Sequence, residues 1–148
     1  MTSNSSRLLK LFLSRRSIRR FSSKPVKETD VQTIVEVGQH APTACNLQTY
    51  SVVWVRDSRL REEVLDACGV TGSIGNAPVV FVICADVRRL GKALDYLGDD
   101  HCMKHGYGYS IKLMSIMDAS FMAENMTMTA EYLVLDRCSL AQPSQTMK

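Results

Sequence analysis

The sequence lacks acidic residues at its amino-terminal end. No Asp or Glu occurs before Glu28, so the net charge of +3 over 148 residues is concentrated at that end. This uneven charge excludes a uniformly basic surface. An acid-free start rich in Ser and Arg is also typical of an organelle transit peptide, and that alternative stays open. The basic residues of this stretch are Arg7, Lys10, Arg15, Arg16, Arg19, Arg20, Lys24 and Lys27.

Long apolar runs are also missing. No stretch approaches the roughly 18 apolar residues of a membrane-spanning helix. The apolar residues 8–13 are interrupted by Lys10 and are not followed by a small-residue cleavage site, which argues against a secretory signal. With 45% hydrophobic and 22% charged residues, the composition predicts one soluble domain over residues 1–138 and a tail over 139–148. We expect a cytoplasmic protein without a membrane partner.

Paired cysteine motifs are absent as well. The sequence has five cysteines in no C-x-x-C arrangement, and an odd number argues against a closed disulfide framework, so we expect free thiols. His101 and His105 are four residues apart and could face one metal ion on a helix. No second cluster of ligands supports such a site, and we predict none. The cysteines are Cys45, Cys68, Cys84, Cys102 and Cys138.

Apolar periodicity predicts a mixture of helices and strands without internal repeats. The expected helices cover residues 5–13, about 28–41, a segment after the capping residue Asp57, and about 110–135. The second helix begins either at Lys27-Glu28 or in a capping box of Thr29 and Gln32. The expected strands cover 51–56 and 78–85, the latter as a central strand covered on both faces. The third helix is expected to bury Leu60, Val64, Leu65 and Cys68.

The last helix is predicted to be apolar on most of its surface. Such a helix must be buried, either in a large core or between two subunits. A chain of 148 residues cannot easily enclose seven helical turns on every side, which favours a homodimer. The alternative is an ordinary core helix whose methionines fill irregular gaps.

Two segments carry the chemistry. Residues 15–21 contain several guanidinium groups and a hydroxyl. Such groups bind a phosphate through charge-assisted hydrogen bonds. Residues 41–48 form a small-residue loop rich in amide donors and acceptors, suited to a flat polar heterocycle. The pair therefore points to a phosphorylated, ring-bearing cofactor. A solvated basic face or a nucleic-acid patch is the alternative for the first segment, but aromatic residues are scarce there, and we predict no nucleic-acid partner.

The order and spacing of these segments resemble the nitroreductase family of flavoproteins. The similarity rests on Arg15-Arg16-Ser17-Ile18-Arg19-Arg20-Phe21 and on Ala41-Pro42-Thr43-Ala44-Cys45-Asn46-Leu47-Gln48. Asn76-Ala77-Pro78 before the apolar strand, and Met117-Asp118-Ala119 with Glu124-Asn125-Met126 on the long helix, are similar to later landmarks of the family.

The resemblance implies an α+β fold, with a central sheet flanked by helices and a long buried helix at a homodimer interface that holds FMN. It implies that Arg15, Arg16, Ser17 and Arg19 contact the FMN phosphate, ribityl chain and ring edge. It further implies that the loop approaches the flavin from the other subunit through Thr43, Ala44, Asn46 and Gln48. Cys45 replaces a small residue, often Gly, and Thr49-Tyr50 replaces Pro-Trp, so the loop and the pocket wall differ from the family pattern.

The implied activity is electron transfer from NADH or NADPH, through FMN, to a small-molecule acceptor such as a nitroaromatic compound or a quinone. No side chain need act as a nucleophile, so we assign no catalytic residue. Family members continue beyond the long helix into a further strand and a basic FMN contact, whereas this sequence ends within ten residues of Ser139. We therefore expect a domain shortened at its carboxyl end, and the alternative function is a flavin-binding or dimerising remnant without turnover.

Overall fold

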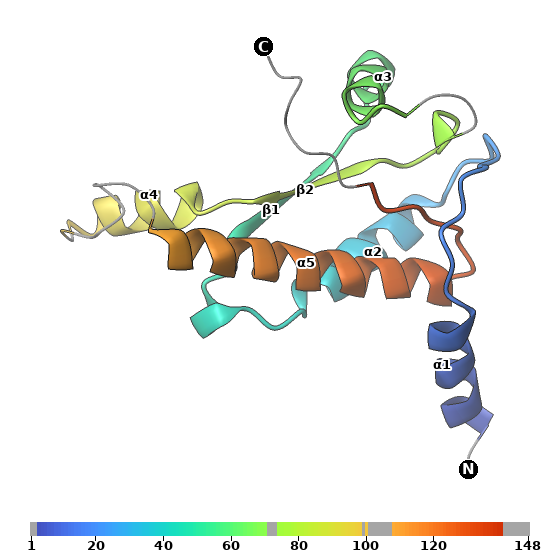
Figure 1. The fold of residues 1–148 in the computed structure, drawn as a ribbon, viewed down its shortest axis with the longest axis horizontal. Coiled ribbons are helices and arrows are strands. Elements are labelled where there is room, and N and C mark those ends of the chain that lie inside the picture. Colours follow the sequence, from blue (N-terminus) through green and yellow to red (C-terminus); the bar gives the residue numbers. More distant parts are fainter. Residues whose placement is uncertain (1–2, 71–73, 99, 101–107, 141–148) are drawn as a thin grey trace.

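A computed structural model describes residues 3–70, 74–98, 100 and 108–140. It contains helices and two strands, and a 3-10 turn covers Ala44–Asn46 (Figure 1). The predicted α+β class is confirmed. The helices are α1 (Ser3–Ser14), α2 (Glu28–Gln39), α3 (Ser58–Ala67), α4 (Arg88–Tyr96) and α5 (Tyr109–Tyr132), and the strands are β1 (Tyr50–Trp54) and β2 (Phe81–Ala85).

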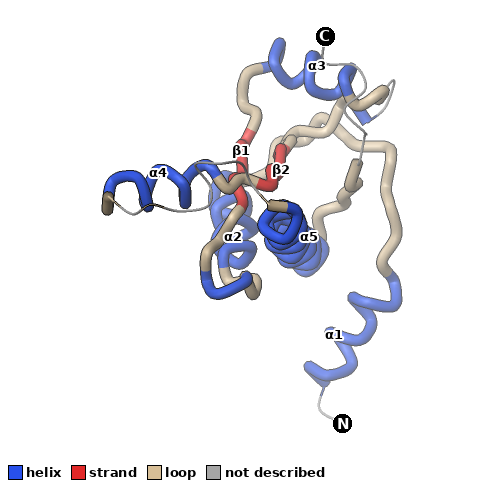
Figure 2. The backbone as a smooth tube through the Cα atoms, turned by 60° about the vertical axis from the view of Figure 1, so that its left-hand side comes forward, coloured by secondary structure: helices blue, strands red, loops and turns tan. Residues whose placement is uncertain are grey.

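The two strands form an antiparallel pair in which Tyr50 lies opposite Ala85 and Trp54 opposite Phe81. Helix α5 runs beside both strands and also packs on α2, so it is the central element of the fold (Figures 1 and 2). None of the helices in the described part of the chain is long and apolar enough to cross a membrane.

The core lies where α2 meets α5. Ile34 of α2 is buried there in one cluster with Met122 and Met126 of α5, and Val31 of α2 is also buried. The helices approach closely because Gly38 has no side chain: a Cβ atom built on Gly38 would lie 2.6 Å from Met126 Cγ. The predicted apolar face of this second helix is thus confirmed.

The first residues of α3 and α2 test two predictions about how these helices begin. The Asp57 carboxylate accepts a hydrogen bond of 2.8 Å from the Leu60 backbone N–H, which confirms Asp57 as the cap of α3. Helix α2 begins after Lys27 without a side-chain cap, so the Lys27-Glu28 start is correct and the Thr29 capping box is not formed.

Two burial predictions are wrong. Strand β2 is half-buried rather than covered on both faces; Cys84 and Ala85 are exposed, and β1 is its sole strand partner among the described residues. Leu60 is exposed rather than buried, since α3 projects from the end of the sheet away from α5 and buries only Leu65 (Figure 1). Both errors arise because apolar periodicity reports which face is apolar and not what covers it.

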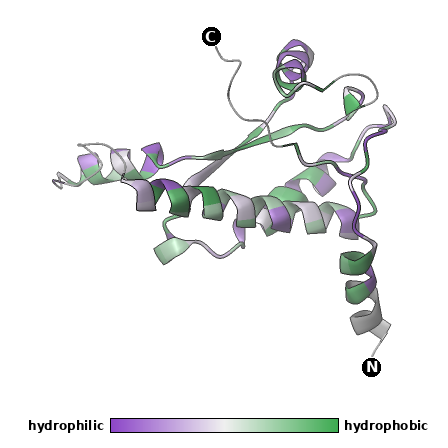
Figure 3. Ribbon diagram, in the orientation of Figure 1, coloured by the Kyte–Doolittle hydropathy of each residue, from purple (hydrophilic) through white to green (hydrophobic). Residues whose placement is uncertain are grey.

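Helix α5 has two apolar faces with different surroundings. The face toward α2 and the sheet buries Ser115, Asp118, Ala119, Met122, Met126 and Thr129. The opposite face exposes Leu113, Ile116, Met117 and Phe121, whose spacing of three and four residues places them on one side of the helix. Figure 3 shows apolar residues recurring along the whole length of α5. In a single chain the helix is therefore only half covered.

Candidate functional site

Loop 41–49 connects α2 to β1 and has an unusual backbone. Cys45, Asn46 and Gln48 have φ angles of 50°, 56° and 50°, the left-handed region that residues with a side chain rarely adopt. The backbone N–H of Leu47 closes the 3-10 turn on the Ala44 carbonyl at 2.9 Å. A loop with three strained residues persists only where its surroundings hold it.

Asp118 holds this loop from the middle of α5. Its carboxylate accepts hydrogen bonds from the Ala44 N–H at 3.0 Å, from the Thr49 N–H at 3.2 Å and from the Thr49 hydroxyl at 2.7 Å. The Asp118 side chain is 1% exposed. Burying a carboxylate costs free energy unless its oxygens accept hydrogen bonds, and all three donors come from the loop.

The carboxyl end of the loop also forms hydrogen bonds with residues at the junction of β2 and α4. The Arg89 guanidinium donates a hydrogen bond of 2.5 Å to the Gln48 carbonyl, and the Asp86 N–H donates one of 3.0 Å to the Thr49 carbonyl. The Ser51 hydroxyl in turn donates to the Asp86 carboxylate at 2.5 Å. The loop is therefore held between α5 on one side and the start of α4 on the other.

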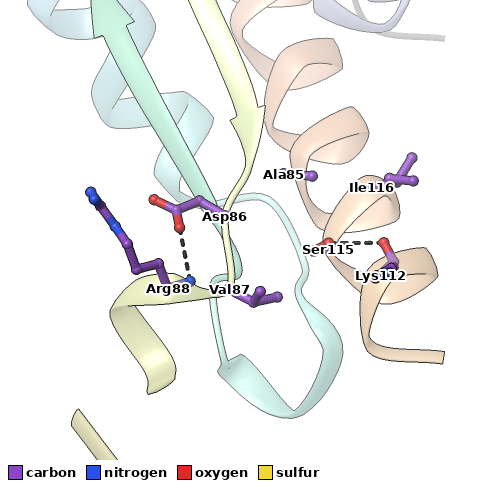
Figure 4. A pocket seen from close by; sticks show the side chains of 7 residues that line it. All are labelled: Ala85, Asp86, Val87, Arg88, Lys112, Ser115 and Ile116. Atoms are coloured by element: carbon purple, nitrogen blue, oxygen red, sulfur yellow. Dashed lines mark hydrogen bonds between the residues drawn. The ribbon is translucent and has the colours of Figure 1, made fainter. Parts of the chain in front are cut away.

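Beside this fastening lies an open hollow of about 450 Å³. Figure 4 shows Ala85, Val87 and Ile116 around it, with the Arg88 side chain extending away from Lys112. Its lining is mainly apolar and includes the cations Arg88 and Lys112. The full set of lining residues is Ala85, Asp86, Val87, Arg88, Lys112, Ser115 and Ile116.

Two ionisable groups near the loop are perturbed. Burial raises the pKa of the Tyr50 phenol above its ordinary value; Arg89 opposes this rise and Asp118 adds to it. The hydrogen bond from Ser51 lowers the pKa of the Asp86 carboxyl, and the backbone N–H of Arg88 acts in the same direction. At neutral pH, Tyr50 is therefore a neutral hydroxyl and Asp86 an anion.

The arginine segment 15–20 lies elsewhere, at the carboxyl end of α5. Its backbone is fastened by the Ile18 N–H, which donates to the Arg137 carbonyl at 3.0 Å. Arg15 and Arg16 are exposed and make no hydrogen bond or ion pair with any other described residue. Ser17 and Arg19 are also exposed. The guanidinium groups of Arg15 and Arg16 are thus available to an external anion.

The two predicted halves of the site are not adjacent within one chain. Loop 41–49 is bound to Asp118, whereas the arginine segment is bound to the chain beyond Leu133. Since an α-helix rises 1.5 Å per residue, the stretch of α5 between these two points separates the halves by about 20 Å. Figures 1 and 2 both show them on different sides of the molecule. The donor set at each half fits one part of a flavin nucleotide: cations and a hydroxyl suit the phosphate, and the Asn46 and Gln48 side-chain amides suit the ring.

The profile described as the nitroreductase family matches residues 13–146. The chain belongs to the nitroreductase family. It is 34% identical over 119 residues to an NADPH-dependent oxidoreductase of Staphylococcus aureus (strain USA300), a match that covers 78% of this chain and 45% of that protein.

Solved nitroreductases have the same fold. NfrA1 nitroreductase from B. subtilis superposes with a TM-score of 0.80 at 27% identity, over 85% of this chain and 51% of that one. The NADPH:FMN oxidoreductase from Vibrio harveyi, complexed with NAD+, has a TM-score of 0.76 at 28% identity, over 85% and 52%. The chain therefore spans about half the length of the relatives it matches.

The nitroreductase-like arrangement includes residues that the sequence analysis did not assign to the site. Asp118 was noted as a family landmark, but its hydrogen bonds to Ala44 and Thr49 bridge more than 65 positions of sequence and were not predicted. One pattern could have indicated it, because Asp118 shares a helix face with Ala119, Met122 and other buried residues, and an acid on an apolar face needs partners. No comparable sequence pattern indicates that Arg89 binds the loop.

Some predictions fall outside the described residues. His101, Cys102 and His105 lie there, as does most of the predicted tail. Within the described part of the chain, the four remaining cysteines are free thiols, and no group of three or more His, Cys, Asp and Glu could hold a metal ion. These four cysteines are Cys45, Cys68, Cys84 and Cys138.

Proposed function

We propose that this chain is an FMN-dependent oxidoreductase that passes electrons from NADH or NADPH to a small acceptor such as a nitroaromatic compound or a quinone. The observation that carries the proposal is the position of two sites along α5, in a chain of the nitroreductase family. The amide loop is held at the middle of α5, and the arginine pair, which has no partner among the described residues, lies at its carboxyl end. The NADPH-dependent and NADPH:FMN activities named for its relatives support the same chemistry.

The arginine segment would hold the phosphate end of FMN. Arg15 and Arg16 would bind phosphate oxygens through charge-assisted, bidentate hydrogen bonds that a lysine cannot reproduce. The Ser17 hydroxyl would donate a further hydrogen bond, and Arg19 would lie toward the ring edge. Because Ile18 fastens the backbone to Arg137, the segment keeps its place while these side chains reach the ligand.

The ring would be covered by loop 41–49 of a second copy. One chain places the two halves about 20 Å apart along α5, whereas the phosphate and ring of one nucleotide are joined by a short ribityl chain. A homodimer resolves this mismatch because each arginine segment then faces the partner's loop. Thr43, Ala44, Asn46 and Gln48 would approach the flavin in this way.

The exposed apolar face of α5 supports the same dimer. Leu113, Ile116, Met117 and Phe121 are 43%, 54%, 47% and 44% exposed, and apolar side chains grouped on one helix face mark an interaction surface. Pairing this face with a second copy would complete the burial that the sequence of the helix predicts. We therefore place the subunit interface on α5.

When bound, FMN supplies the redox chemistry, taking a hydride from the nicotinamide donor and passing electrons to the acceptor. The residues of this chain bind and orient it. Positive charge from Arg19 would favour an anionic reduced ring over a neutral one, because opposite charges attract. We assign no side chain to proton transfer, and protons would come from solvent.

An absorbance and fluorescence titration with FMN tests the proposal. We expect quenching of flavin fluorescence on binding and bleaching of the visible flavin band when NADPH or NADH is added without oxygen. The double variant Arg15→Ala/Arg16→Ala should weaken FMN binding at least tenfold. Arg59→Ala is the matched control, because Arg59 is exposed but already pairs with Glu63 at 3.0 Å.

The outcomes separate the candidate functions. A protein that shows no spectral change with FMN would contradict the proposal. FMN binding without oxidation of NADH or NADPH in the presence of a quinone would favour the flavin-binding remnant. Binding to a DNA duplex that weakens steeply with salt, in place of FMN binding, would instead assign the arginine segment to nucleic acid.

A further inference from the structure

The buried carboxylate of α5 has a role that the flavin contacts alone do not explain. Asp118 is 1% exposed and lies on the buried face of α5, which also carries the core residue Met122. An acid in that position is unfavourable for packing the core, so its stabilising interactions must be specific. Each of its hydrogen bonds goes to loop 41–49 and none to its own helix or to α2.

The loop depends on this support because its own conformation is strained. Cys45, Asn46 and Gln48 all have φ between 50° and 56° and none of them is glycine. The Asp118 carboxylate accepts hydrogen bonds on both sides of the strained stretch, from the Ala44 N–H before it and from the Thr49 N–H after it. A clamp at both ends fixes the distance that the strained residues must span.

We propose that Asp118 is the positioning residue that sets loop 41–49 in the conformation in which it closes over the flavin of the partner subunit. This inference rests on the proposed function for its ligand. It follows from the placement of Asp118 about 20 Å along α5 from the arginine segment of its own chain. Asp118 acts therefore in trans: it orders the loop for the other copy's cofactor and leaves its own phosphate site unchanged.

The first experiment measures the clamp without any cofactor. Asp118→Ala and Thr49→Val are compared with wild type by hydrogen exchange at the Ala44 and Thr49 amides. We expect exchange at both amides to rise at least tenfold in Asp118→Ala, and a smaller rise in Thr49→Val, which removes only the hydroxyl donor. Thr129→Ala is the matched control, because the hydroxyl of buried Thr129 on the same helix donates to the Asn125 carbonyl and to no loop residue among those described.

The second experiment measures FMN affinity by fluorescence. Asp118→Ala should bind FMN at least tenfold more weakly than wild type, whereas Thr129→Ala should match wild type. If Asp118→Ala fails to fold, Thr49→Val and Asp118→Asn, which keeps the side-chain volume and one acceptor oxygen, provide the comparison. Wild-type FMN affinity and unchanged amide exchange in these variants would overturn the inference.

A mixed dimer tests the trans arrangement. An Asp118→Ala chain is combined with an Arg15→Ala/Arg16→Ala chain through two different affinity tags. One of the two sites then carries both defects, and the other combines wild-type arginines with a wild-type loop. We expect one FMN bound per mixed dimer with wild-type affinity, although each parent homodimer binds weakly. Absence of a wild-type site would show that Asp118 acts on its own chain's site.

Wild-type protein keeps the two proposals separate. Failure of wild type to bind FMN would overturn the proposed function, whatever the amide exchange shows. Tight binding by wild type and equally tight binding by Asp118→Ala would overturn only the role of Asp118.

Discussion

Val134 and Gly69 occupy the same position in the same helix-ending motif. After α5, the Val134 N–H bonds to the Glu131 carbonyl and the Leu135 N–H to the Ala130 carbonyl. After α3, the N–H groups of Gly69 and the following residue make the same two bonds to the last turn of that helix. This pattern requires a left-handed residue, and the φ angles are 62° at Val134 and 64° at Gly69.

Replacing Val134 by glycine should therefore stabilise the protein. A left-handed conformation costs a residue with a Cβ about 1–2 kcal/mol, and a β-branched side chain is a marked outlier there. Glycine offsets part of this gain through its greater freedom in the unfolded chain. We expect Val134→Gly to raise the free energy of unfolding by about 1 kcal/mol, as measured by urea denaturation.

Val134 is 87% exposed, so the substitution removes almost no packing. The reciprocal variant Gly69→Ala serves as the control and should lower the free energy of unfolding by a similar amount, about 1 kcal/mol. A loss of stability in Val134→Gly would show that the side chain makes contacts that outweigh its backbone strain.

A second prediction concerns the contact of α2 with α5. In Gly38→Ala the new Cβ would lie 2.6 Å from Met126 Cγ and 2.9 Å from Met122 Cε. Alanine is the better helix former, but the overpacked methionines must shift, and we expect a net loss of about 1–2 kcal/mol. Urea denaturation measures it. Gly108→Ala is the control, since a Cβ there meets no atom of the described residues within 4 Å, and its stability should change by less than about 0.5 kcal/mol.

A third prediction concerns the ion pair between Arg137 and Glu131, close to the carboxyl end of α5. The Arg137 Nη2 atom lies 2.8 Å from Glu131 Oε1, and these side chains are 11% and 15% exposed. The Arg137 Nε and Nη2 atoms make no well-aligned hydrogen bond in the described part of the chain, so the guanidinium depends on this one carboxylate. Glu131→Gln should lower the free energy of unfolding by about 2 kcal/mol, because it leaves a buried charge without a counterion.

The double variant Glu131→Gln/Arg137→Gln separates this cause from a simple loss of packing. Removing both charges should recover part of the stability lost in Glu131→Gln, when all variants are compared by urea denaturation. If Glu131→Gln/Arg137→Gln is less stable than Glu131→Gln alone, the two substitutions add, and the proposed dependence of Arg137 on Glu131 is contradicted.

Local features of this fold could be predicted from the sequence. Asp57 precedes a helix in a position to accept its first free N–H, and the apolar spacing of Val31, Ile34 and Gly38 identifies the buried face of α2. These features depend on residues within one or two turns of each other. Helix and strand types follow from such neighbours, so both strands and the long helix were predicted within a few residues.

Features that depend on distant partners were not predictable. Leu60 has the spacing of a buried residue but no neighbouring element covers it, and β2 is apolar without being enclosed. The clamp of Asp118 on Thr49 joins residues 69 positions apart. The sequence indicates that an acid on an apolar face needs donors, but only the packing of α5 against the loop shows which donors these are.

The last prediction uses Asp86, which ties the end of β2 to the loop through its N–H and to Ser51 through its carboxylate. The Ser51 hydrogen bond lowers the pKa of Asp86 below its ordinary value of 3.8. A carboxyl whose pKa is lower in the folded state binds protons more weakly there than in the unfolded chain. Its stabilisation is therefore complete above about pH 4 and is lost as the pH falls through the folded-state pKa.

Ser51→Ala should accordingly reduce the free energy of unfolding by about 1 kcal/mol at neutral pH, and the difference from wild type should shrink as the pH falls from neutral to below 3.8. Urea denaturation across this range measures both. Ser120→Ala is the matched control, because the exposed Ser120 hydroxyl bonds to the Ile116 carbonyl, which does not titrate, so its effect should stay constant with pH. A Ser51→Ala deficit that is equally constant would show that the hydrogen bond does not depend on the charge of Asp86.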